Sequence, residues 1–220
     1  MPHSLQLCIN SQSDEQRIEI EEFIHTCFAK SYDANIQSFM PMLIAVRHQQ
    51  SGRLLAALGV RVADNSNLYL EKYLGQSAEN ILTQRFNQEI KRQQIVEIGN
   101  LASVNTKAMQ WLFLQANAYL YQQHYQWAIS TMIPKLHHSF CRQGLQLSTL
   151  TVAQKQVLTF NEQRIWGRYY EKSPLVVAGN ITESYQQFKQ LTQATPKLNS
   201  LNHLWHQAVN MSAGKACPSL

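Results

Sequence analysis

The chain has 220 residues, 45% of them hydrophobic, which is enough for one large domain with a real core. Its net charge of +5 lies in the last third, because residues 1–133 hold 10 Lys+Arg and 11 Asp+Glu whereas residues 134–220 hold 9 and 3. The basic residues are spread singly, so we expect no nucleic-acid partner, and the longest apolar run, residues 40–46, is too short to span a bilayer.

The four cysteines are far apart and show no paired spacing: Cys8, Cys27, Cys141 and Cys217. We therefore expect neither a metal site nor a disulfide framework. The first residues lack the basic segment and long apolar stretch of a secretory signal, which favours a cytoplasmic protein with reduced thiols. No linker divides the chain, so we expect a single domain over residues 1–220 with a helical extension over about 182–213.

The first elements expected are a strand over residues 5–9 and a helix that runs from a capping box of Ser13 and Gln16 to about Lys30. Apolar residues recur on one face of this helix: Ile20, Phe23, Ile24, Cys27 and Phe28. Residues 42–48 and 53–62, separated by a turn at 50–52, predict a hairpin.

The middle of the chain predicts a short extended piece at residues 68–70 and a helix over about 77–90. A strand over Ile95–Ser103 runs directly into a largely apolar helix over 106–124, and 127–132 reads as a buried strand.

Pro134 and Gly144 mark the two ends of the next helix. Strands over 145–152 and 175–178 and two polar helices over about 183–192 and 198–210 complete the pattern. This alternation indicates a mixed α/β sheet covered by helices on both faces.

Three segments carry the most unusual residues: LYLEKYL at 68–74, IVEIGNLAS at 95–103 and WGRYYEKSPLVVAG at 166–179. Together with FCRQGL at 140–145, they resemble in order and spacing the bacterial family named thermostable hemolysin, over roughly residues 14–182. The resemblance implies a GNAT-like acyltransferase fold related to the autoinducer (acyl-homoserine lactone) synthases.

The chain departs from its implied relatives at three places. The synthases have an arginine where this chain has Asn100, and many GNAT enzymes have a glycine-rich loop where residues 102–107 contain no glycine. Phe140 also stands where a GNAT enzyme often has a tyrosine acid. The chain therefore lacks part of the residue pattern for the homoserine-lactone reaction and part of the ordinary coenzyme-A pattern.

The resemblance implies transfer of a fatty acyl group from coenzyme A, or from the phosphopantetheine of acyl carrier protein, to a small amine or amino-acid-like acceptor. The pantetheine arm would lie between the strands 95–103 and 127–132, where backbone N–H groups near Leu101 polarise the thioester. The following helix opens on residues suited to a phosphate: Ser103, Asn105, Thr106 and Lys107. The missing glycine favours a carrier protein as donor, and the basic last third either steers that acidic partner or is only a solvated surface.

Three polar residues are candidates for catalysis, each with a structural alternative. Glu97 is the candidate general base, because burial in a strand raises a carboxyl pKa, or it is a carboxylate bonded to a neighbouring Arg or Tyr. Asn100 either orients the acceptor or caps the strand end. Glu71 either binds a cationic amine or forms an ion pair with Lys72 or another surface group.

Aromatic residues near these candidates offer area for the acyl chain or the acceptor, or belong to the core: Tyr73, Trp166, Tyr169 and Tyr170. Two other functions stay open. The family name implies a membrane-active cytolysin, although no stable membrane insertion is expected from this sequence. The missing glycines also allow a non-catalytic acyl-binding protein.

Overall fold

The computed structural model describes residues 5–11, 14–64, 66–142 and 144–194. Its strands are β1 (Leu5–Asn10), β2 (Met42–His48), β3 (Leu54–Val62), β4 (Ile95–Ser103), β5 (Trp127–Met132), β6 (Leu147–Val152) and β7 (Leu175–Asn180). Its helices are α1 (Arg17–Tyr32), α2 (Glu71–Leu74), α3 (Ala78–Phe86), α4 (Thr106–Gln122), α5 (Pro134–Arg142), α6 (Phe160–Ile165) and α7 (Ile181–Ala194), with short 3₁₀ turns η2 (Arg92–Gln94), η3 (Lys155–Val157) and η4 (Tyr169–Lys172).

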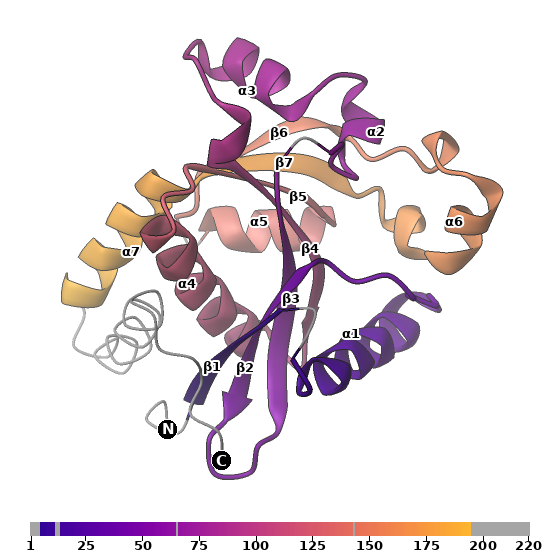
Figure 1. Cartoon of the computed structure of the whole chain (residues 1–220), viewed down its shortest axis with the longest axis vertical. Coiled ribbons are helices and arrows are strands. Elements are labelled where there is room, and N and C mark those ends of the chain that lie inside the picture. Colours follow the sequence, from indigo (N-terminus) through magenta and orange to yellow (C-terminus); the bar gives the residue numbers. More distant parts are fainter. Residues whose placement is uncertain (1–4, 12–13, 65, 143, 195–220) are drawn as a thin grey trace.

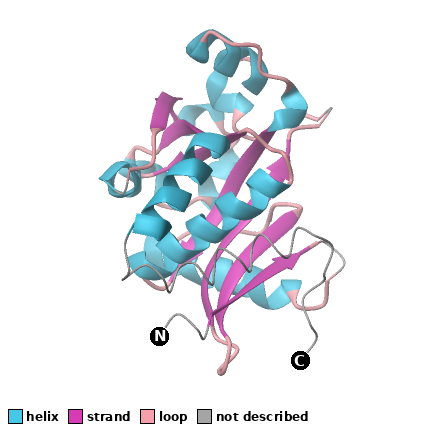
Figure 2. Cartoon of the chain, turned by 90° about the vertical axis from the view of Figure 1, so that its left-hand side faces the viewer, coloured by secondary structure: helices cyan, strands magenta, loops and turns pink. Residues whose placement is uncertain are grey.

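The described strands form one seven-stranded sheet in the order β1-β2-β3-β4-β5-β7-β6. Every neighbouring pair is antiparallel except β4 and β5, which are parallel. Helices cover both faces, as Figures 1 and 2 show. The mixed α/β architecture expected from the sequence is therefore confirmed.

The two faces of the sheet carry different helices (Figure 1). Helices α4 and α7 pack on one face, where Val96 and Ile98 belong to the largest apolar cluster. Helices α1, α2 and α3 pack on the other face. Because side chains alternate along a strand, Ile95 and Glu97 point to this second face, where Gly99 leaves its backbone uncovered by a side chain of its own.

Some local expectations were wrong. Gln16 is itself the N-cap residue of α1 and makes no capping bond through its side chain, while Ser13 lies outside the described residues. Helix α3 ends at Phe86, because Asn87 adopts the left-handed region with φ 51°. Residues 68–70 lead into α2 through a turn and are not extended. The expected helix over 198–210 falls outside the described residues.

The strands β4 and β5 separate halfway along β4. Their parallel pairing runs from Ile95 to Ile98 and ends there. On the other side of β4, Asn100 and Leu101 lie opposite the single residue Leu58, because the register with β3 shifts between Gly99 and Ala102. Such a bulge bends a strand, and Asn100 takes the left-handed conformation with φ 52°. The bulge therefore turns the end of β4 away from β5.

Candidate functional site

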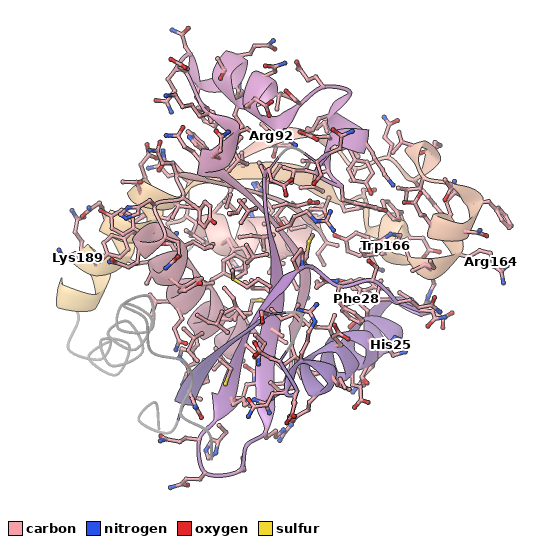
Figure 3. All side chains as sticks on the ribbon, viewed as in Figure 1. His25, Phe28, Arg92, Arg164, Trp166 and Lys189 are labelled. Atoms are coloured by element: carbon pink, nitrogen blue, oxygen red, sulfur yellow. The ribbon has the colours of Figure 1, made fainter. Side chains whose placement is uncertain are left out.

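A cavity of about 430 Å³ opens where β4 and β5 separate, and we call it the central cavity. Its walls come from α1 and the segment 36–40, from β3 to β5 near the bulge, from the turn before α2, and from α6 and η4. Phe28 of α1 and Trp166 after α6 line it, and their ring centroids are 6.0 Å apart. Figure 3 labels both side chains. The volume falls within the range of roughly 300–1,000 Å³ that small-molecule sites occupy.

Glu97 borders this cavity and has a fully buried side chain. Its carboxylate accepts the backbone N–H groups of Tyr69 at 3.0 Å and Leu70 at 3.2 Å, and Arg61 Nη1 lies 3.5 Å away. Burial outweighs these stabilising contacts and raises the pKa of the Glu97 carboxyl above its ordinary range. The site thus holds a carboxylate that accepts a proton more readily than an exposed glutamate does.

Asn100 uses its side chain to fix the segment that covers the sheet. Its Oδ1 accepts the N–H of Met40 at 2.8 Å, and its Nδ2 donates to the carbonyl of Ser38 at 3.3 Å. Met40 in turn lies over two glycines that face each other across the strands, Gly59 and Gly99. The Asn100 amide therefore shapes the cavity wall. That Asn100 also orients the acceptor, as the sequence suggested, stays a prediction.

Glu71 is not among the residues that line the central cavity. Its carboxylate bonds Arg92 Nη1 at 2.7 Å and the backbone N–H groups of Leu68 and Ala78, each at 2.8 Å. Although burial opposes its charge, these bonds lower the pKa of Glu71 below its usual value. Glu71 therefore forms an ion pair, with Arg92 as its partner and not Lys72. Its bonds to Leu68 and Ala78 hold the chain around α2 together.

Aromatic side chains form the wall opposite the sheet. Trp166, Tyr169 and Tyr170 line the central cavity, whereas Tyr73 does not. Tyr73 instead hydrogen-bonds through its hydroxyl to that of Tyr170, and Trp166 Nε1 donates to the hydroxyl of Tyr69 at 3.1 Å. Burial raises the pKa of each of these phenols, so they stay neutral donors at physiological pH.

These contacts join the turn before α2 to the segment that contains α6 and η4. An ion pair between Lys72 and Glu162 adds to them, and Lys72 Nζ lies 4.3 Å from the centre of the Tyr69 ring. At the other end, the N–H of Arg168 donates to the carbonyl of Tyr32 at 2.7 Å, and a Cβ on Gly167 would be 2.3 Å from the Asp33 oxygen. The α6 segment is thus clamped over the cavity from two sides.

A second cavity of about 420 Å³ lies between α1, α4 and α5, and we call it the helix cavity. It shares wall residues with the central cavity: Phe28, Tyr32, Leu101, Ile133 and Leu136. Three of the expected phosphate-site residues line it, namely Ser103, Asn105 and Thr106, together with the basic residues Lys135 and Arg142.

The start of α4 differs in part from the expectation. Asn105 is the N-cap residue, and its Oδ1 accepts the N–H of Ala108 at 2.9 Å. Lys107 is not among the residues that line the helix cavity, and its Nζ lies 5.2 Å from the centre of the Trp111 ring. Basic charge reaches this cavity from α5, which belongs to the basic last third of the chain, although Lys135 and Arg142 were not among the expected phosphate-site residues.

Sequence reasoning missed several residues of the central cavity. Arg61 interrupts the otherwise apolar run of β3, and this anomaly was the available signal. Met40, Tyr69 and Glu162 carried no comparable signal, because only the folded chain brings them to the cavity. Within the described part of the chain, no group of three or more His, Cys, Asp or Glu residues could hold a metal ion.

Comparisons with known proteins agree with this geometry. The model of a family described as thermostable hemolysin matches residues 10–185. No curated protein matches the sequence. One solved structure with a similar fold is the CoA-dependent acyl-homoserine lactone synthase BjaI, which is 10% identical, with 95% of this chain and 99% of that chain covered and a TM-score of 0.56. Another is the N-acyl amino acid synthase FeeM from uncultured soil microbes, which is 10% identical, with 87% of this chain and 98% of that chain covered and a TM-score of 0.55. The AHL synthase LasI is also similar, with 11% identity, 80% of this chain and 89% of that chain covered and a TM-score of 0.51. At these identities the likeness shows the fold, which is the GNAT-like fold that the sequence resemblance implied.

Proposed function

We propose that this chain, which belongs to the thermostable hemolysin family, is an N-acyltransferase that moves a fatty acyl group from an acyl thioester to a small amine or amino-acid-like acceptor. The observation that carries the proposal is the separation of β4 from β5 beyond Ile98, because it opens a cavity whose lining includes the buried Glu97. The similar structures support it, since their names describe acyl-homoserine lactone and N-acyl amino acid synthases.

The donor in this proposal enters between the separated strands. Its pantetheine arm runs past Leu101, which lines both cavities, and the phosphate end lies in the helix cavity near Ser103 and Thr106. Lys135 and Arg142 add positive charge there. Coenzyme A and acyl carrier protein both present such an arm, and one similar structure is named as a complex with SAM and isopentyl-CoA. No metal takes part in the proposed chemistry.

The reaction needs an amine without its extra proton and a polarised thioester. Glu97, whose pKa is raised by burial, takes that proton directly or through a water molecule. The amine nitrogen then attacks the thioester carbonyl, and backbone N–H groups near the bulge stabilise the oxyanion. The new C–N bond forms and the C–S bond breaks, and the departing thiolate receives the proton held by Glu97. The Glu97 carboxylate regenerated in this way takes the second proton from the nitrogen, which leaves the neutral amide, and passes it to solvent. Asn100 keeps the covering segment in place during these steps.

Thiol release tests the proposal directly. Purified protein is incubated with acyl-CoA or acyl carrier protein of several chain lengths and with a panel of amines, and free thiol is followed with a chromogenic reagent. We expect release that depends on both substrates. Glu97→Gln should lower the rate about 10²- to 10⁴-fold, which is the usual contribution of general base catalysis. Glu89→Gln, at an exposed position, is the matched control and should keep full rate.

Two outcomes would support the other readings instead. Leakage of vesicles without any thioester would favour a membrane-active protein; among the described residues, no helix is both long enough and apolar enough to cross a membrane. Saturable binding of an acyl thioester without turnover, with any acceptor, would favour a non-catalytic acyl-binding protein. Full turnover by Glu97→Gln would remove Glu97 from the mechanism.

A further inference from the structure

We propose that the acceptor is an α-amino acid with an apolar or aromatic side chain, and that Arg61 binds its carboxylate. This inference rests on the proposed acyltransferase function and names the class of molecule that receives the acyl group. It starts from a charged side chain in the central cavity that the rest of the fold leaves largely unused.

Arg61 is the only Lys or Arg among the described residues that line the central cavity. Its one polar partner in the described part of the chain is Glu97, at the long distance of 3.5 Å, and its side chain is 29% exposed. A guanidinium has five N–H donors in a planar fork that matches a carboxylate. Most of these donors are therefore free to bind a ligand.

Two other arginines show what a structural role looks like in this fold. Arg92 bonds Glu71, Glu79 and the carbonyls of Asp64 and Ser66. Arg17 bonds Glu21 and two backbone carbonyls, with distances of 2.7 to 2.9 Å. Both use all three of their guanidinium nitrogens in hydrogen bonds that tie segments together, whereas Arg61 has one long contact and faces a cavity.

The charges around Arg61 suit a zwitterion. Arg61 and Glu97 are directly opposed on neighbouring strands, so a cation and an anion lie side by side at this end of the cavity. The other acidic residue of the lining, Glu162, is already paired with Lys72. The carboxylate of an α-amino acid would meet Arg61, and its amine would lie next to it, toward Glu97 and the separated strands.

The rest of the wall selects the side chain of the acceptor. Tyr69, Trp166 and Tyr170 come together there, with ring centroids of 6.4 Å between Tyr69 and Trp166 and 6.2 Å between Trp166 and Tyr170. Phe28 and Tyr32 continue the aromatic surface from α1. Such a wall favours apolar and aromatic groups and gives no partner for a second charge, so aspartate and lysine should be poor acceptors.

The test compares three acceptors that share a phenyl group: L-phenylalanine, L-phenylalaninamide and 2-phenylethylamine. Thiol release from an acyl-CoA gives kcat/KM for each. We expect L-phenylalanine to exceed the other two by about 10- to 100-fold, the value of a charge-assisted hydrogen bond. Equal use of the acid and its amide by the unaltered protein would overturn the inference and leave the acyltransferase function intact.

Variants of Arg61 test whether this residue causes the preference for the acid over its amide. Arg61→Gln should lower kcat/KM for L-phenylalanine by about 10- to 100-fold more than for the amide, so that the preference for the acid disappears, and Arg61→Lys should keep part of the preference. Arg85→Gln, at an exposed position on α3, is the matched control. An equal loss for acid and amide in Arg61→Gln would contradict a carboxylate site.

Binding separates the two proposals if no thiol is released. Quenching of tryptophan fluorescence then reports L-phenylalanine and L-phenylalaninamide directly, because Trp166 lines the cavity. Tighter binding of the acid, lost in Arg61→Gln, would support the inference although acyl transfer had failed. Equal or absent binding of both would refute the inference.

Discussion

At the scale of single residues, Glu97 decides the chemistry because it is a charged group with no exposed surface in an apolar strand. The fold compensates this burial with two backbone N–H groups from residues 69 and 70 and with Arg61. A glutamate in such a run is anomalous in the sequence, so it could be singled out before the structure was known. Arg61 breaks its own strand in the same way and could have been found by the same reasoning.

The raised pKa of Glu97 predicts how the rate depends on pH. A base acts in its deprotonated form, so kcat/KM should fall as the pH drops through the pKa of Glu97, and this acid limb should lie above the ordinary glutamate value of about 4.3. The measurement is a pH profile with one acceptor. A limb at the ordinary value, or the same limb in the residual activity of Glu97→Gln, would contradict the assignment.

The raised pKa of Glu97 also predicts how the free energy of unfolding depends on pH. Because the folded protein holds the Glu97 proton more tightly than the unfolded chain does, this group stabilises the fold fully below the unfolded pKa. That contribution is lost as the pH rises through the higher folded pKa. The loss of unfolding free energy between the unfolded and the folded pKa of Glu97 should therefore be absent in Glu97→Gln, as urea unfolding at several pH values would measure.

At the scale of elements, local patterns predicted most strands and helices because their apolar periodicity lies within each segment. The turn at 68–70 could not be predicted, since its N–H groups bond the carboxylates of Glu71 and of the distant Glu97. The bulge of β4 was missed for a similar reason: it depends on pairing with β3 and on the contacts of Asn100 with the 38–40 segment. The central cavity arises from these tertiary contacts.

The glycine pair across β3 and β4 gives a prediction about packing. A Cβ on Gly59 would lie 2.5 Å from Met40 Cβ, whereas a Cβ on Gly99 would lie 2.6 Å from the flexible Met40 Cε. Gly59→Ala should therefore destabilise the protein by about 1–3 kcal/mol, the usual cost of overpacking, and Gly99→Ala by less. Urea unfolding measures both.

A double-mutant cycle sharpens this prediction. Met40→Ala removes Cε but keeps Cβ, so it should relieve the cost of Gly99→Ala and leave that of Gly59→Ala. Equal relief of both variants would show that Met40 does not lie over the two glycines in this way.

At the scale of the whole molecule, the seven-stranded sheet places two cavities next to each other along the separated strands. The central cavity holds Glu97, Arg61 and the aromatic wall, and the helix cavity holds the start of α4 and two basic residues of α5. The sequence could indicate which strands border the opening, because the resemblance covers them. It could not show that basic charge comes from α5, since Lys135 and Arg142 reach the helix cavity only because the fold brings α5 beside α4.

The most direct measurement is a crystal structure of the protein with a non-hydrolysable acyl-CoA analogue. The account predicts that the pantetheine arm lies between Gly99–Leu101 and 131–133, with the carbonyl oxygen near the Leu101 N–H and the acyl group in the central cavity. An analogue bound elsewhere, or strands β4 and β5 paired along their full length with no arm between them, would contradict it.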